Sequence, residues 1–195
     1  MPELSLPSSE TIAEVLVVDD EPMMADLLQE WVREKWRCEA VYNGSDALEI
    51  VSENIDVVLL DRQMPDFSGE EVLRELRTMG LDCQVMFISG VEPDPDVLEL
   101  PFDDYLMKPV ERPSLQEAIE ALLIRRSYHP VVQEFFSAVA KIELLQDALS
   151  PRELADDERY LALRREADEL RQTADATLGQ RTQHVEEIYD VEADD

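Results

Sequence analysis

The sequence predicts an α/β protein with a parallel sheet of five strands covered by helices, followed by a smaller unit of helices only. Two observations support this. Through the first 128 residues, short β-branched apolar runs alternate with helical patterns, which is typical of buried parallel strands joined by crossover helices. From residue 130 onwards the apolar residues recur only at helical spacing. The chain of 195 residues is long enough for one domain of ordinary size and a smaller one.

The elements of the first domain, expected over 14–128, follow a flexible N-terminal segment at 1–13. The strands are predicted near residues 15–18, 38–42, 57–60, 85–89 and 105–108. The first helix spans 22–35, with proline in its first turn, and the second runs to residue 52 with Ser45 as N-cap. Ser68 or Asp66 caps the third helix, which ends near Met79 before Gly80. A short fourth helix is broken by Pro101, and the fifth spans 114–128.

The second unit is expected over 130–180 as a hairpin or short coiled coil of two helices. The first helix has apolar residues at three- and four-residue spacing and ends near Leu149. Ser150, Pro151 and Glu153 form a capping box that opens the second helix. Its apolar stripe, more typical of a hairpin core than of a dimer seam, contains Tyr160, Leu163, Ala167, Leu170 and Ala174. The acidic tail, 181–195, is predicted to be disordered.

The composition is extremely acidic, with 46 acidic against 17 basic residues and a formal net charge of −29. Such a surface repels itself, and salt screens the repulsion, so we expect a halophilic protein from a salt-rich cytoplasm. An ordinary acidic regulator is the alternative. Cys38 and Cys83 lack metal-ligand spacing and are expected to be reduced thiols. No signal peptide or long apolar run is visible, which predicts a soluble, cytoplasmic protein that does not contact the membrane.

Polar residues suited to phosphoryl chemistry follow four of the five predicted strands: Asp19 and Asp20, Asp61, Ser89, and Lys108. Because chemistry collects at the carboxyl ends of parallel strands, these groups should converge on one crevice. Asp61 suits a nucleophile that accepts a phosphoryl group. The neighbouring carboxylates of Asp19 and Asp20 need a hard divalent cation, and Mg²⁺ fits them. Lys108 supplies a charge and Ser89 a hydroxyl for phosphoryl oxygens.

Residues 14–128 resemble the receiver domain of two-component response regulators, a flavodoxin-like fold. The resemblance rests on the acidic pair Asp19-Asp20, on Asp61 with its Met64–Gly69 loop, on Ser89, and on Lys108-Pro109. It implies phosphorylation of Asp61 by a sensor histidine kinase. It also implies Mg²⁺ held by Asp20, Asp61 and the Gln63 backbone carbonyl, with Asp19 binding directly or through water, and a cis Lys108–Pro109 peptide.

The family further implies that Ser89 swings towards the phosphate and that Tyr105 follows it. Tyr105 would then carry the signal to a surface formed by the fourth helix, fifth strand and fifth helix of the receiver. The chain differs from the family pattern over residues 90–102, which are proline-rich, acidic and short. Residues 130–180 resemble the HalX domain, a helical module that follows receivers in salt-loving archaea; the resemblance rests on Phe135-Phe136, the Ser150–Leu154 motif and Tyr160.

The expected function is therefore a phosphoacceptor signalling protein, not an enzyme that turns over a separate substrate. The helical module would act by binding an unknown downstream protein, by forming a homodimer, or in transcriptional regulation. An aspartate-dependent phosphatase is a weaker alternative, because that chemistry places its nucleophile after the first strand, and Asp19 and Glu21 match it poorly. A DNA-binding transcription factor is the other alternative, but the acidic helices carry no basic stripe for DNA phosphates.

Overall fold

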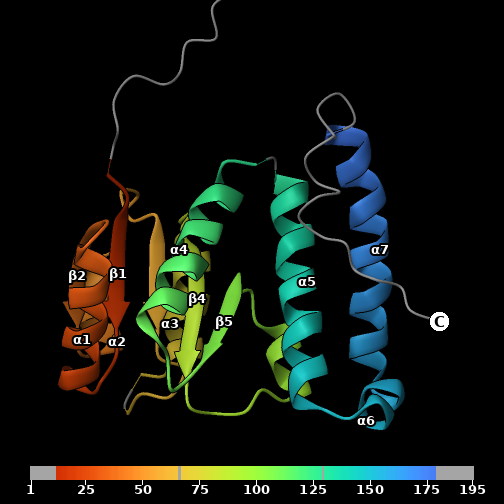
Figure 1. The fold of residues 1–195 in the computed structure, drawn as a ribbon, viewed down its shortest axis with the longest axis horizontal. Helices are drawn as coiled ribbons and strands as arrows, with labels where there is room; N and C mark the ends of the chain where they lie inside the picture. The colour runs from red at the N-terminus through yellow and green to blue at the C-terminus, as the bar shows by residue number, and fades with distance from the viewer. Residues whose placement is uncertain (1–11, 66, 129, 179–195) are drawn as a thin grey trace, which may run out of the picture.

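A computed structural model describes residues 12–65, 67–128 and 130–178, and it contains the expected five-stranded parallel sheet (Figure 1). The strand order is β2-β1-β3-β4-β5, and every neighbouring pair is parallel. The strands are β1 (Glu14–Val18), β2 (Arg37–Val41), β3 (Val57–Leu60), β4 (Gln84–Ser89) and β5 (Asp104–Met107). The chain reverses its direction of winding between β1 and β3, so a crevice opens at the carboxyl ends of these two strands.

Helices cover both faces of the sheet, and alternate strand residues pack against each layer. Val15 and Val17 of β1 face α1 (Pro22–Arg33) and α4 (Arg112–Arg126). Leu16 and Val18 face the opposite core, which contains α2 (Gly44–Ile50) and α3 (Gly69–Thr78). Both sets of strand residues are almost fully buried. The apolar runs therefore arise because each strand has a hydrophobic layer on both sides.

Several element boundaries differ from those predicted. The second helix is capped by Asn43, whose side chain accepts a hydrogen bond from the Asp46 N–H, and not by Ser45. The connection from β4 to β5 holds only a short 3₁₀ helix, η1 (Pro95–Glu99). Helix α4 begins at Arg112, two residues before the predicted start, because Pro113 fits its first turn. Ser68, the first of the two predicted candidates, caps α3.

The C-terminal unit is an antiparallel helical hairpin, as expected, with α5 (Pro130–Ala148) and α7 (Glu158–Leu178) side by side (Figure 1). The prediction of one continuous second helix was wrong: α6 (Pro151–Asp156) is separate from α7. Asp157 is extended, and its side chain accepts hydrogen bonds from the Arg159 and Tyr160 N–H groups. A second capping site therefore interrupts the helical pattern.

The helical hairpin packs against the receiver-like part of the chain. Leu145, Leu154 and Tyr160 belong to the same buried cluster as Phe87 and Tyr105 of the sheet. Tyr160, Ala167 and Ala174 on α7 are buried, which confirms that the apolar stripe forms a core within one chain. None of the helices described is long and apolar enough to cross a membrane. The N-terminal segment 1–13, except for its last two residues, and the tail 181–195 lie outside the described residues.

Candidate functional site

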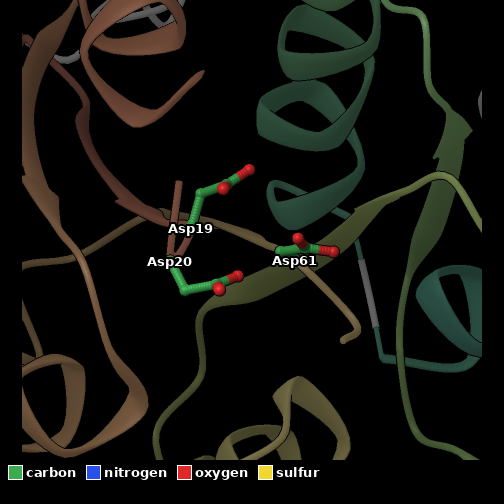
Figure 2. Close-up of side chains that lie close together, drawn as sticks. All are labelled: Asp19, Asp20 and Asp61. Carbon is green, nitrogen blue, oxygen red and sulfur yellow. The ribbon is translucent and has the colours of Figure 1, made fainter. Parts of the chain in front are cut away.

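Three carboxylates meet at the carboxyl ends of β1 and β3, as Figure 2 shows. Asp19 and Asp20 directly follow β1, and Asp61 directly follows β3. One oxygen from each carboxylate lies within 4.8 Å of the other two. Asp19 and Asp61 are buried, with 1% and 7% exposure, whereas Asp20 is partly exposed. The grouping arises because β1 and β3 are neighbours in register, so that Val18 pairs with Leu60.

Lys108 brings a positive charge into this group. Its Nζ donates hydrogen bonds to Asp19 Oδ2 at 2.8 Å and to Asp61 Oδ2 at 3.1 Å. The peptide between Lys108 and Pro109 is cis, as the resemblance to receiver domains implied. Burial lowers the pKa of Lys108, but the hydrogen bonds that its ammonium donates to Asp19 and Asp61 outweigh that effect and leave the pKa raised. The lysine is therefore a permanent cation at the site.

The charge balance of the site favours an additional cation. Burial raises the pKa of Asp61, and the nearby Asp19 carboxylate raises it further, while Lys108 and the Gln63 N–H oppose both effects. Three carboxylates against one ammonium leave an excess of negative charge in a partly buried place. Carboxylate oxygens are the ligands that Mg²⁺ prefers, and the cation binds through one or two of them while it keeps several waters. The donor set therefore fits a magnesium ion.

The loop from β3 to α3 holds Asp61 in place through its backbone. The Gly69 N–H donates to the Arg62 carbonyl at 3.1 Å. A Cβ atom on Gly69 would lie 2.0 Å from the Asp61 carbonyl oxygen, so only glycine allows this close approach. The Gln63 N–H donates to Asp61 Oδ1 at 3.3 Å, which keeps the Gln63 backbone beside the carboxylates. Ser68 and Glu71 complete the loop with a capping box.

Ser89 and Tyr105 lie on the two neighbouring strands. Ser89 is the last residue of β4 and is fully buried, and the Lys108 N–H donates to its carbonyl. Its hydroxyl oxygen accepts the Val91 N–H at 3.2 Å. The Tyr105 hydroxyl donates to the Val91 carbonyl at 2.8 Å, and its ring is buried against Phe87 and Phe102. Ser89 thus lies at the same sheet edge as the carboxylates. Tyr105 is linked to Ser89 through the backbone of Val91.

The sequence reading missed two components of this site. Arg62 is nine-tenths buried beside Asp61 and pairs with Glu70 at 2.9 Å, while its Nη1 atom has no hydrogen-bond partner among the described residues. The only sign of Arg62 in the sequence was that a polar residue directly follows Asp61. Val91 connects Ser89 and Tyr105 solely through its backbone. No side-chain pattern reports such a contact, so it was invisible in the sequence.

The parallel sheet with an acidic cluster, a lysine before a cis proline and a buried serine defines a receiver domain. The comparisons agree with this class. The chain belongs to the response regulator receiver domain family, whose model matches residues 15–120. The model of the HalX domain matches residues 124–191.

Sequence relatives also place the chain among response regulators. A putative transcriptional regulator of Haloferax volcanii is 38% identical over 175 residues, which covers 89% of this chain and 30% of that protein. Response regulator SaeR of Staphylococcus aureus is 31% identical over 137 residues, covering 67% of this chain and 60% of SaeR. The chain thus spans less than two thirds of the length of either relative. These similarities support a two-component response regulator.

A solved structure with the same fold is the response regulator TrrA from Thermotoga maritima in complex with Mg²⁺ and a beryllium fluoride group. It is 32% identical, with a TM-score of 0.52, and the match covers 57% of this chain and all of that one. The shared part corresponds to the receiver.

Proposed function

We propose that the protein is a two-component response regulator that a sensor histidine kinase phosphorylates on Asp61 in a Mg²⁺-dependent reaction. The main support is the contact of Lys108 with both Asp19 and Asp61 within a cluster of three carboxylates. That arrangement combines a nucleophilic oxygen, ligands for a divalent cation and a charge for a phosphoryl oxygen. The TrrA structure, with its Mg²⁺ and beryllium fluoride, supports the same assignment.

In the proposed reaction, an Asp61 carboxylate oxygen attacks the phosphorus of a phosphohistidine. A new phosphorus–oxygen bond forms, the phosphorus–nitrogen bond breaks, and the released imidazole takes a proton from solvent. Asp20, Asp61 and the Gln63 carbonyl would hold the Mg²⁺, with Asp19 binding directly or through water. When bound there, the ion would supply positive charge to offset the charge on the phosphoryl oxygens. Lys108 moves its hydrogen bond to a phosphoryl oxygen, and the Ser89 hydroxyl turns to donate to another.

The response then passes to the helical hairpin, which acts by binding a partner protein, by dimerising or in transcriptional regulation. Phosphorylation replaces the single charge of the Asp61 carboxylate with about two negative charges on a phosphoryl group next to Ser89 and Lys108, and such a change biases any element with two arrangements. The relative described as a putative transcriptional regulator favours a role in transcription through a partner. Direct DNA binding has little support, because the exposed arginines of α7 alternate with acidic side chains.

The Asp61→Asn variant tests the assignment. We expect the native chain to be labelled by a small phosphodonor such as acetyl phosphate when Mg²⁺ is present, and the variant to remain unlabelled, because an amide oxygen cannot form a stable acyl phosphate. Intact-protein mass spectrometry measures the added phosphoryl group. Asp82→Asn removes an exposed carboxylate elsewhere and serves as the matched control, with labelling at the native level.

Labelling that persists in Asp61→Asn would refute the phosphoacceptor assignment, and labelling that is unaffected by a chelator would refute the magnesium site. The phosphatase alternative predicts steady release of phosphate from small phosphate esters. The sequence argues against it, because that chemistry places its nucleophile after the first strand with a second acid two residues on, and Asp19 and Glu21 match this pattern poorly. Turnover abolished by Asp19→Asn but retained in Asp61→Asn would reverse this conclusion.

A further inference from the structure

A cleft of about 510 Å³ lies between the receiver and the helical hairpin. Its walls come from the end of α3, the start of β4, the connection from η1 to β5, and helices α5 and α7. The volume falls in the range of about 300–1,000 Å³ that is usual for small-ligand sites. Asp19, Asp20 and Asp61 do not line the cleft, so it is separate from the candidate phosphorylation site.

Lys141 of α5 is the cation that a ligand in this cleft would meet. Its ammonium has three N–H donors, and among the described residues only the Leu100 carbonyl, at 2.6 Å, accepts one of them. The Phe102 ring centre lies 4.9 Å from the ammonium. Arg77, which also lines the cleft, is already paired with Asp103 at 2.7 Å and donates to two backbone carbonyls. Lys141 therefore has donors left over in a place where an unpaired charge is costly.

The apolar wall of the cleft comes from leucines that the hairpin core leaves partly exposed. Leu163 and Leu170 belong to the apolar stripe of α7, whose other members are buried. These two leucines are only half-buried, and both line the cleft together with Leu98 of η1. An apolar group placed against them would remove this surface from water, which is favourable.

Carboxylates stand at the rim of the cleft. Glu134 of α5 and Glu166 of α7 line it and are exposed. Glu166 raises the pKa of Lys141, against the effect of burial, so the two charges lie near each other. No ion pair joins them in the described part of the chain. The gap between them suits a ligand that carries both a negative and a positive group.

We propose that the cleft binds an apolar α-amino acid, whose carboxylate accepts from Lys141, whose ammonium faces Glu166 and whose side chain packs on the leucines of α7. A carboxylate without an ammonium would meet the repulsion of Glu134 and Glu166, and an amine without a carboxylate would leave Lys141 unpaired. A zwitterion avoids both costs, because each of its charges has an opposite partner. This binding does not depend on the phosphorylation of Asp61.

Binding of L-leucine to the full chain tests the proposal, measured by isothermal titration calorimetry at one fixed KCl concentration. Lys141→Met removes the ammonium and keeps an unbranched side chain, and Glu166→Gln removes the charge at the rim. We expect the dissociation constant to rise about tenfold or more in Lys141→Met, because a hydrogen bond to a charged group is lost. In Glu166→Gln it should rise about two- to fivefold, since that charge is exposed. Arg165→Ala, exposed and outside the cleft, should bind as the native chain does.

Two analogues of leucine test the need for both charges on the ligand. 3-Methylbutylamine lacks the carboxylate and should bind the native chain about tenfold more weakly than leucine or worse. 4-Methylpentanoate lacks the ammonium and should bind about two- to fivefold more weakly. In the native chain, the methyl groups of bound leucine should show nuclear Overhauser effects to the Leu163 and Leu170 side chains. This readout does not depend on the stability of any variant.

The proposal is overturned if leucine gives neither a heat of binding nor Overhauser effects to the leucines of α7. Equal affinity for leucine in the native chain and in Lys141→Met would overturn it too, because the carboxylate would then have another partner. If 4-methylpentanoate binds as tightly as leucine, the cleft does not recognise an amino acid. Each of these results leaves the labelling of Asp61, and so the proposed function, unaffected.

Discussion

Lys141 shows how strongly a single residue can be constrained by its position between two parts of the chain. Its ammonium is largely buried between the Leu100 carbonyl and the Phe102 ring. Burial lowers its pKa below the ordinary value of 10.5, while Asp103 and Glu166 act in the opposite direction and Arg77 acts with burial. The buried ammonium is thus a cost to the folded state.

This pKa shift predicts a pH dependence of stability. Between the pKa of folded Lys141 and 10.5, the unfolded chain binds more protons than the folded chain, so the free energy of unfolding rises with pH. Below the folded pKa the cost of burying the ammonium is present in full. We therefore expect the native chain to gain stability relative to Lys141→Met as the pH rises through this interval, measured by urea denaturation. A difference that is constant across the interval would contradict the shift.

At the scale of elements, two capping boxes of the same design fix the starts of α3 and α6. Ser68 and Glu71 exchange hydrogen bonds at the first, and Ser150 and Glu153 do so at the second. The first box closes the loop that carries Asp61, and the second directs the chain from α5 back towards η1. The same short polar motif therefore fixes the start of one helix next to the site and of another in the helical hairpin.

Replacing either capping serine with alanine should lower the free energy of unfolding by about 0.5–2 kcal/mol, because an N–H at the helix start loses its acceptor. Ser52→Ala provides the control: this serine is exposed in a loop, and we expect a change within about 0.5 kcal/mol. Chemical denaturation of the three variants measures the differences. If Ser68→Ala and Ser150→Ala are no less stable than the control, the capping boxes do not contribute as proposed.

For the molecule as a whole, the dominant property is a formal net charge of −29. Favourable pairs such as Lys35–Glu120 and Arg112–Glu34 are exposed and contribute little each. They cannot offset the repulsion among the many remaining carboxylates. The compact state should therefore depend on screening by salt, which supports the interpretation of a halophilic protein.

We expect the melting temperature of the native chain to rise with KCl concentration, because screening removes more repulsion than attraction from so acidic a surface. Differential scanning calorimetry measures the shift. Sucrose at equal osmolality serves as the control, since it strengthens burial without screening charge. A melting temperature that falls or stays constant with KCl would refute the halophilic interpretation.

Much of the fold was readable from local pattern, and the site was readable from the ends of the strands. The apolar runs around Val17 and Leu59 are buried on both faces, which is typical of a covered parallel sheet. The fold then places Asp19, Asp61 and Lys108 together, because residues that follow parallel strands share one edge. These inferences need only periodicity and chain order.

The errors lie where competing local signals had to be weighed. Asn43 and Ser45 are both good caps, and in the structure it is Asn43 that accepts the Asp46 N–H. Asp157 reads as an ordinary exposed helix residue, yet it ends α6 and caps α7. Helical spacing alone does not reveal such a break, because the apolar stripe continues on the same face after it.

The sequence by itself thus determined the class of fold, the grouping of Asp19, Asp61 and Lys108 at the strand ends and the presence of a helical hairpin, since each depends on patterns that are local or repeated. Only the tertiary structure decided that the hairpin lies against η1 and β5, that Lys141 reaches the Leu100 carbonyl, and that Val91 links Ser89 to Tyr105. Those contacts join residues far apart in the chain, or join them through backbone atoms that every residue type shares. Their formation depends on how complete elements pack, which no short stretch of sequence encodes.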